Sequence, residues 1–266
     1  MSARGQKIFK SIIVVVFIGV FAFVNLVPNM SLYKIECLHD YTHEYTSSVN
    51  EWFKENSGAK KTMMILGGIF SDIITLMTLG YWTIKVKTWR LPIALVLVYV
   101  AKALTSLLFK YRYPDGYLWE NPGFYSLTTP YGASNDMHFT LHVALLYVIF
   151  QELRTLELHW LAPTIAFVIF LYQAAVALTT RGAYIIDLFA AFIFGHYFFV
   201  VAEQLSYYID VGIFGLTFQE RFPNFQTNCG KCKHPINQWT KNNVEDVQRA
   251  MDNQRRHQNN GNSQNQ

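Results

Sequence analysis

The sequence has few charged residues and few cysteines. Lys, Arg, Asp and Glu together make up 15% of its 266 residues, and there are only three cysteines. It contains no internal repeat, no glycine-rich nucleotide-binding fingerprint and no concentrated basic surface of the kind that binds nucleic acid. The sequence therefore gives no indication of a nucleotide-binding site, and no nucleic-acid partner is expected.

The sequence is instead rich in long apolar segments. Hydrophobic residues make up 52% of the chain and aromatic residues 16%, a composition typical of a membrane protein. The sequence predicts an all-α fold, a bundle of six transmembrane helices within residues 1–216, and a tail, 217–266, whose Asn/Gln-rich end is expected to be disordered. The six predicted spans are 8–27, 63–84, 91–109, 137–156, 160–179 and 184–203.

The distribution of basic residues predicts the orientation of this bundle. The N-terminus, the 85–90 and 151–159 loops and the tail hold about twice as many Lys and Arg residues as the opposite loops. Both termini are therefore expected in the cytoplasm, and the loops at 110–136 and 179–183 on the exoplasmic side. The expected location is an endomembrane, either endoplasmic reticulum or Golgi, or the plasma membrane. The sequence leaves a mitochondrial membrane open, because no acidic residue precedes the first span.

A polar cluster begins the fourth predicted span. Asn135 and Asp136 are residue types favoured at the start of a helix. His138 and His142 are then four residues apart, on one face of the first two turns. Ionisable groups at membrane depth are costly, so this pattern indicates a functional site.

A second polar cluster begins in the turn between the last two spans and continues into the start of the sixth span; it contains Arg181, Tyr184 and Asp187. The preceding two spans are joined by a short turn, so they are expected to pack antiparallel and to bring His142 and Asp187 to the same membrane face. Position 183 lies one helical turn before Asp187, where a histidine would be oriented by the carboxylate. The residue there is Ala183.

Cations and aromatic rings lie beside the same predicted face. Lys110 and Arg112 precede a long loop that contains Trp119 and Tyr131. This arrangement suits either an anionic phosphate held beside an acyl region or ordinary anchors at the membrane interface.

Other ionisable and thiol groups leave alternatives open. Asp72 and Lys102, inside the second and third spans, are either a structural pair or interfacial side chains, or they contact a lipid headgroup. In the tail, Cys229, Cys232 and His234 form an incomplete zinc set, and free thiols are the simpler interpretation.

The two polar clusters resemble the sphingomyelin synthase-like branch of the type 2 phosphatidic acid phosphatase superfamily, which includes phosphatidylcholine:diacylglycerol cholinephosphotransferase. The pattern Gly-Asp-x-x-x-Ser-Gly-His-Thr falls on residues 135–143, where Asp136 and His142 match. The pattern His-Tyr-Thr-x-Asp falls on residues 183–187, where Tyr184 and Asp187 match. The resemblance covers roughly residues 60–205.

The resemblance implies a fold and a chemistry for these residues. It implies a six-helix lipid phosphotransferase that needs no metal or cofactor, with phospholipid and diacylglycerol or ceramide as partners. His142 would be the acid/base and Asp187 the orienting carboxylate. Lys110, Arg112, Asp136, His138, Arg181 and Tyr184 would bind substrate. The nucleophilic histidine is replaced by Ala183, and a methyl group cannot attack phosphorus.

Three functional hypotheses follow from this substitution. The first is a membrane protein that keeps the headgroup site but is impaired for covalent transfer, and acts as a lipid-binding or structural protein, such as a subunit of a membrane complex. The second is an active transferase in which an acceptor hydroxyl attacks directly with His138 or His142 as base, or an enzyme inactivated by engineering at position 183. The third, in which His138, His142, Asp136 and Asp187 bind a metal, is disfavoured because no Glu follows the first histidine. Whether the chain is an enzyme is therefore left open.

The predicted orientation can be tested by cysteine labelling. A cysteine introduced in the 119–131 loop should react with a membrane-impermeant thiol reagent applied from the exoplasmic side. A cysteine introduced in the 240–266 tail should not react, because the positive-inside rule places it in the cytoplasm. The reverse labelling pattern would contradict the predicted orientation of both the bundle and the site.

Overall fold

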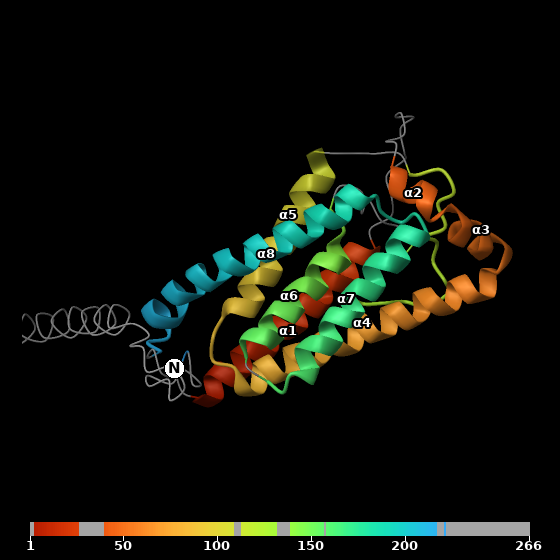
Figure 1. The fold of residues 1–266 in the computed structure, drawn as a ribbon. Coiled ribbons are helices and arrows are strands. Elements are labelled where there is room, and N and C mark those ends of the chain that lie inside the picture. Colours follow the sequence, from red (N-terminus) through yellow and green to blue (C-terminus); the bar gives the residue numbers. More distant parts are fainter. Residues whose placement is uncertain are drawn as a thin grey trace, which may run out of the picture. The chain divides into compact units, whose positions relative to one another are not determined.

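The computed structural model describes residues 3–26, 40–108, 113–131, 139–156, 158–216 and 221. Every regular element in this part of the chain is a helix, as the sequence predicts (Figure 1). The elements are α1 (Ala3–Leu26), α2 (Tyr41–Tyr45), α3 (Ser47–Glu55), α4 (Ser57–Lys85), α5 (Arg90–Leu108), α6 (Leu141–Thr155), α7 (Leu161–Thr179), α8 (Ile185–Tyr207) and the π-helical turn η1 (Tyr208–Ile213).

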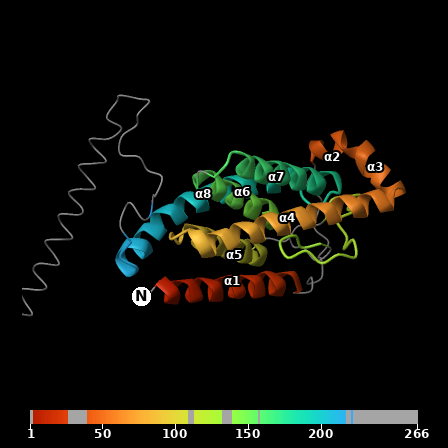
Figure 2. The same cartoon turned by 90° about the horizontal axis from the view of Figure 1, so that it is seen from below.

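Helix α6 forms the centre of the bundle. It contacts α4, α5, α7 and α8, and most of its side chains are buried, including the polar residues His142, Gln151 and Glu152. Helix α1 contacts α4 and runs along one edge of the bundle (Figure 2). The apolar core therefore surrounds α6, and polar side chains on α6 are met by protein rather than by lipid.

Four helical segments are long and apolar enough to cross a membrane: Ser57–Lys85, Arg90–Leu108, Leu161–Thr179 and Ile185–Ile213. They correspond to four of the six predicted spans and support an integral membrane protein. In α1 the apolar segment found among the described residues is the shorter Ile8–Gly19. The 15 residues of α6 extend about 22 Å, less than a hydrocarbon core of about 30 Å. The described part of the chain is thus all-helical, and the arrangement of six spans stays a prediction.

Two short helices that the sequence did not predict form part of a cap at one end of the bundle. Helices α2 and α3 both contact α7, and α3 also contacts α4. Figure 1 shows them at the end opposite the start of α1. We use the term cap for residues 40–55 together with the loop 113–131. The cap is the part of the fold that positions the candidate site.

A buried ion cluster fastens three helices near the other end of the bundle. Arg90 Nε donates to Glu152 Oε2 at 2.8 Å, and Arg90 Nη1 donates to Glu203 Oε2 at 2.6 Å. The side chains of Arg90 and Glu152 are 4% and 0% exposed. Because α5, α6 and α8 each contribute one charge, these helices are tied together at that level.

The chain divides into two compact units, Met1–Gly215 and Leu216–Gln266. The predicted cytoplasmic tail, 217–266, falls in the second unit and lies outside the described residues except for Arg221. The cysteines and histidine of the possible zinc set are among the residues that are not described. The candidate site is contained in the first unit.

Removing one member of the Arg90 cluster should cost more stability than removing two. Arg90→Met leaves the buried Glu152 carboxylate without its cation and is expected to cost about 3 kcal/mol of unfolding free energy. Arg90→Met combined with Glu152→Leu should cost less, because that buried charge is gone. Thermal unfolding in detergent compares the variants, with the exposed Lys54→Met as control. A double variant less stable than the single one would contradict this account.

Candidate functional site

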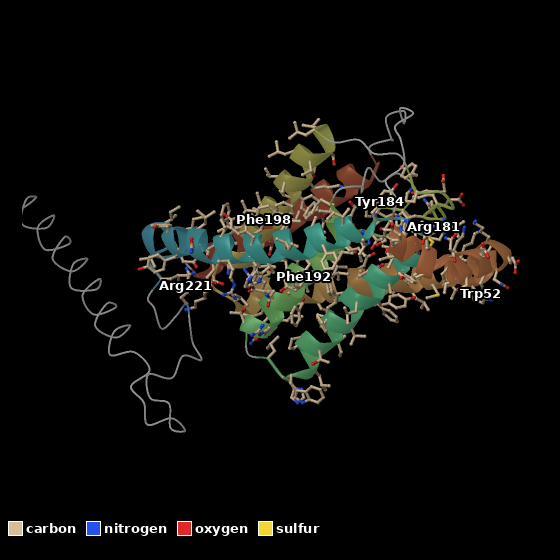
Figure 3. The ribbon with its side chains drawn as sticks, turned by 45° about the horizontal axis from the view of Figure 1, so that its top comes forward. Trp52, Arg181, Tyr184, Phe192, Phe198 and Arg221 are labelled. Carbon is tan, nitrogen blue, oxygen red and sulfur yellow. The ribbon has the colours of Figure 1, made fainter. Side chains whose placement is uncertain are left out.

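The structure describes five of the nine residues that the sequence assigned to the site. Arg181, Ala183, Tyr184, Asp187 and His142 all lie at the cap end of the bundle. Figure 3 labels Arg181 and Tyr184 at the end where α3 carries Trp52, with Phe192 and Phe198 farther along α8. The other four, Lys110, Arg112, Asp136 and His138, lie outside the described residues.

The turn between α7 and α8 has the hydrogen-bond pattern of a Schellman motif. Arg181 N donates to Leu178 O at 3.1 Å, and Gly182 N donates to Ala177 O at 2.8 Å. Arg181 has φ +54°, a left-handed conformation that glycine adopts more readily than other residues. An arginine in this position indicates that its side-chain contacts offset the backbone strain.

The Arg181 guanidinium binds backbone carbonyls of the cap. It donates to Asp115 O and, at 3.3 Å, to His43 O. The turn that contains Asp115 also needs Gly116, because Gly116 has φ +79°, a conformation that other residues rarely adopt. The cation predicted to bind substrate thus holds together two segments of the cap.

Two carboxylates occupy the N-terminus of α8. Asp187 Oδ2 accepts from Tyr184 N at 2.9 Å, and Asp40 Oδ2 accepts from Ile185 N at 2.8 Å. Asp40 also accepts from Thr42 N at 2.8 Å and so caps α2. Burial raises the pKa of Asp40, but the hydrogen bonds from Thr42 and Ile185 outweigh burial and hold that pKa below its usual value. These negative charges are well placed for the positive end of the helix dipole.

The position of Asp187 corrects the sequence argument about residue 183. Helix α8 begins at Ile185 with Tyr184 as its N-cap, so Ala183 precedes the helix. Position 183 is therefore not one helical turn before Asp187. The carboxylate that was expected to orient a side chain at 183 caps the helix instead.

A histidine that the sequence did not single out lies against Ala183. His43 Nε2 is 3.1 Å from Ala183 O, and its ring stacks on Tyr184 with 5.4 Å between centroids. Asp40 Oδ2 is 3.9 Å from His43 Nε2. Burial lowers the pKa of His43, and the bond to Ala183 O and the charge of Asp40 offset only part of this effect. The neutral ring thus links α2 to the turn before α8.

Trp119 fills the space between this turn and α6. A Cβ built on Gly182 would lie 2.7 Å from ring atoms of Trp119, and the indole stacks on His142 with 5.3 Å between centroids and 16° between planes. Trp119 Nε1 donates to Pro130 O at 3.0 Å. Trp119 and Tyr131 are 1% and 7% exposed. These two rings are therefore core residues. The sequence offered two interpretations of them, a lining for a bound lipid phosphate and interfacial anchors, and their burial fits neither.

Helix α6 starts later than the sequence predicts. It begins at Leu141 and not at residue 137, because Phe139 and Thr140 are not helical. His138 lies outside the described residues, so its predicted pairing with His142, also invoked for a metal site, stays a prediction.

The two intramembrane ions predicted in the second and third spans bind different segments. Asp72 accepts from Leu127 N at 3.0 Å, from Thr128 N at 2.8 Å and from Ser126 Oγ at 3.0 Å. Lys102 Nζ donates to Phe139 O at 2.9 Å. Each ion therefore holds a loop onto the bundle.

The assembled cluster is closed. His142, Ala183, Tyr184 and Asp187 are each at most 2% exposed, and Trp119 lies among them. A histidine stacked against an indole and a carboxylate bonded to a helix terminus are arranged for packing and hydrogen bonding. The described geometry offers no exposed pair of groups for acid/base chemistry within this cluster.

Comparisons with known proteins leave the resemblance to the phosphotransferase family as a hypothesis. No family model, no curated protein and no solved structure matches this chain. The functional argument therefore depends on the geometry of the chain itself.

Sequence reasoning missed the contribution of residues 40–55 to this cluster. A local signal was present, since Asp40 is a favoured N-cap residue and precedes the helical segment that carries His43. Its long-range partner, Ala183, is 140 residues away in the sequence. No periodic pattern in a single sequence predicts the contact between His43 and Ala183.

The lowered pKa of His43 predicts that acid loosens the cap. The folded state binds a proton at His43 less readily than the unfolded state, so stability is greatest above pH 6.5 and falls as the pH drops below 6.5 towards the lowered folded value. Hydrogen exchange of residues 40–55 should speed up over this pH range. His43→Gln should flatten the response, whereas His159→Gln, at an exposed position near α7, should leave it unchanged. An identical pH response in both variants would contradict this role.

Proposed function

We propose that this chain is a non-catalytic integral membrane protein with a structural role. Its predicted bundle resembles that of a lipid headgroup phosphotransferase, and the polar cluster at the predicted exoplasmic end joins loops and helix ends where such an enzyme would carry out chemistry. Covalent headgroup transfer is absent, because Ala183 stands where the nucleophile would be.

The packing of Trp119 is the observation that carries this proposal. Its indole lies against both Gly182 and His142, so the side chain proposed as acid/base in an active relative faces an aromatic ring. A phosphate group of a lipid needs this space, and the ring occupies it. The 1% exposure of His142 supports the same conclusion.

The charges around α8 also argue against a bound phosphate. Helix N-termini attract anions because their amide groups are unpaired and the helix dipole is positive there. In this chain Asp40 and Asp187 already accept from the first amides of α8. An anionic headgroup would meet two carboxylates at this position and would be repelled. Arg181, which could have offset them, donates to carbonyls of the cap.

A headgroup-transfer assay tests the proposal. The purified full-length chain is reconstituted in liposomes that contain labelled phosphatidylcholine and either diacylglycerol or ceramide. We expect no transfer above protein-free liposomes. Asp187→Ala should lower the unfolding free energy by about 1 kcal/mol through loss of a helix cap, with no change in transfer.

His142→Gln distinguishes the proposal from an enzyme that works without a nucleophile at position 183. Headgroup transfer by the unmodified chain that His142→Gln abolishes would overturn the proposal in favour of direct attack by an acceptor hydroxyl. The same variant in a structural protein changes stability only, because the ring stacked on Trp119 is replaced.

A further inference from the structure

An unusual polar residue lies on the outer face of α8, far from the cap. His196 is exposed in the isolated chain. It is separated by eleven residues from each end of α8, so it lies about 16 Å from both Ile185 and Tyr207. This depth is close to the middle of a hydrocarbon core of about 30 Å. An ionisable side chain at this depth normally faces protein or a water-filled cavity.

The hydrogen bond that His196 makes at Nδ1 determines whether its other ring nitrogen, Nε2, donates or accepts. Gln151 Nε2 lies 3.1 Å from His196 Nδ1 and 3.0 Å from the Tyr147 hydroxyl. Because the amide NH2 is a donor, His196 Nδ1 is the acceptor, and the ring carries its proton on Nε2. Within the described chain no group pairs with that nitrogen. The Nε2–H group is therefore a hydrogen-bond donor on the outer face.

The next residue supplies an acceptor at almost the same depth. Tyr197 is 60% exposed, and its hydroxyl can accept as well as donate. It differs from His196 by one residue, which corresponds to about 1.5 Å along the helix. Apolar side chains surround the pair on the same side of α8, namely Phe189, Phe192, Ile193 and Val200, which are 58%, 43%, 59% and 41% exposed.

We propose that this face of α8 binds the same face of a second copy of the chain. Copies inserted in one membrane with the same orientation are related by a two-fold axis along the membrane normal, which brings equal depths together. His196 Nε2–H of each copy then donates to the Tyr197 hydroxyl of the other, and the apolar residues pack around the two bonds. A donor and an acceptor at almost the same depth on the exposed side of α8 make this side self-complementary. Polar bonds between transmembrane helices are a recognised source of association.

This interface goes beyond the proposed function and does not depend on it. The face is on the lipid-exposed side of α8, whereas the cap cluster is at its N-terminus. An active transferase and an inert protein could both associate through it. The experiment that tests this interface therefore measures association alone.

Energy transfer between labelled copies in phosphatidylcholine liposomes tests the proposal. The full chain is labelled with donor or acceptor dye, and the protein-to-lipid ratio is varied. The unmodified chain should associate as a dimer. Tyr197→Phe removes only the hydroxyl and should weaken association roughly sevenfold for the two lost bonds, and His196→Leu should weaken it by a similar factor. The double variant should be no weaker than either single variant, because both lose the same bonds.

Tyr81→Phe is the matched control, since it removes a phenol hydroxyl from an exposed position of α4. It should leave association unchanged. Thermal unfolding of each variant checks whether His196→Leu has kept its fold, and Tyr197→Phe tests the same bonds without touching Gln151. A chain that stays monomeric at every protein-to-lipid ratio would overturn the proposal. Association that neither Tyr197→Phe nor His196→Leu weakens would overturn it as well.

Discussion

The indole of Trp119 fills the space between the α7–α8 turn and the start of α6, and the closed geometry of the cap end depends on this contact. Gly182 is required beside it, because a side chain there would collide with the ring. Around this ring, Arg181 and Asn50 hold the turn at Asp115 and Gly116, while Asp40 and His43 hold the residues before α8. The proposed structural role depends on this packing, because the ring lies against Gly182 and His142, where the resemblance would place a lipid headgroup.

Burial in a membrane explains why so many polar groups in this protein have structural partners. Within a bilayer an unsatisfied donor or acceptor costs several kcal/mol, so helix ends and loops near the membrane must be bonded by protein. Asp72 holds the 126–128 loop, and Asp187 caps α8. An ionisable residue in an apolar sequence therefore indicates a structural hydrogen bond as readily as a catalytic group. At the cap end these hydrogen bonds involve Arg181, Tyr184 and Asp187, three of the residues that the sequence assigned to the site.

The sequence predicted which segments form helices better than it predicted where those helices end and what they contact. The long apolar runs predicted α4, α5, α7 and α8 to within a few residues, because hydrophobic length alone sets a helix of that kind. Asp187 lies in the first turn of α8, as the sequence predicted, but the helical spacing predicted between positions 183 and 187 was wrong. Residues 183 and 184 precede the helix, and helical spacing does not apply across them. The roles of His43 and Trp119 depend on contacts between distant segments, which no local pattern encodes.

The most direct test of this account is the unfolding free energy of Trp119→Ala compared with that of Trp52→Ala. Both changes remove an indole from the cap, but Trp119 is 1% exposed and Trp52 is 49% exposed. If Trp119 holds the cap closed, its loss should cost about 3 kcal/mol or more, as expected for a buried tryptophan, and Trp52→Ala should cost far less. Equal stability of the two variants would contradict the central claim, because the space beside Gly182 and His142 would then be available without cost.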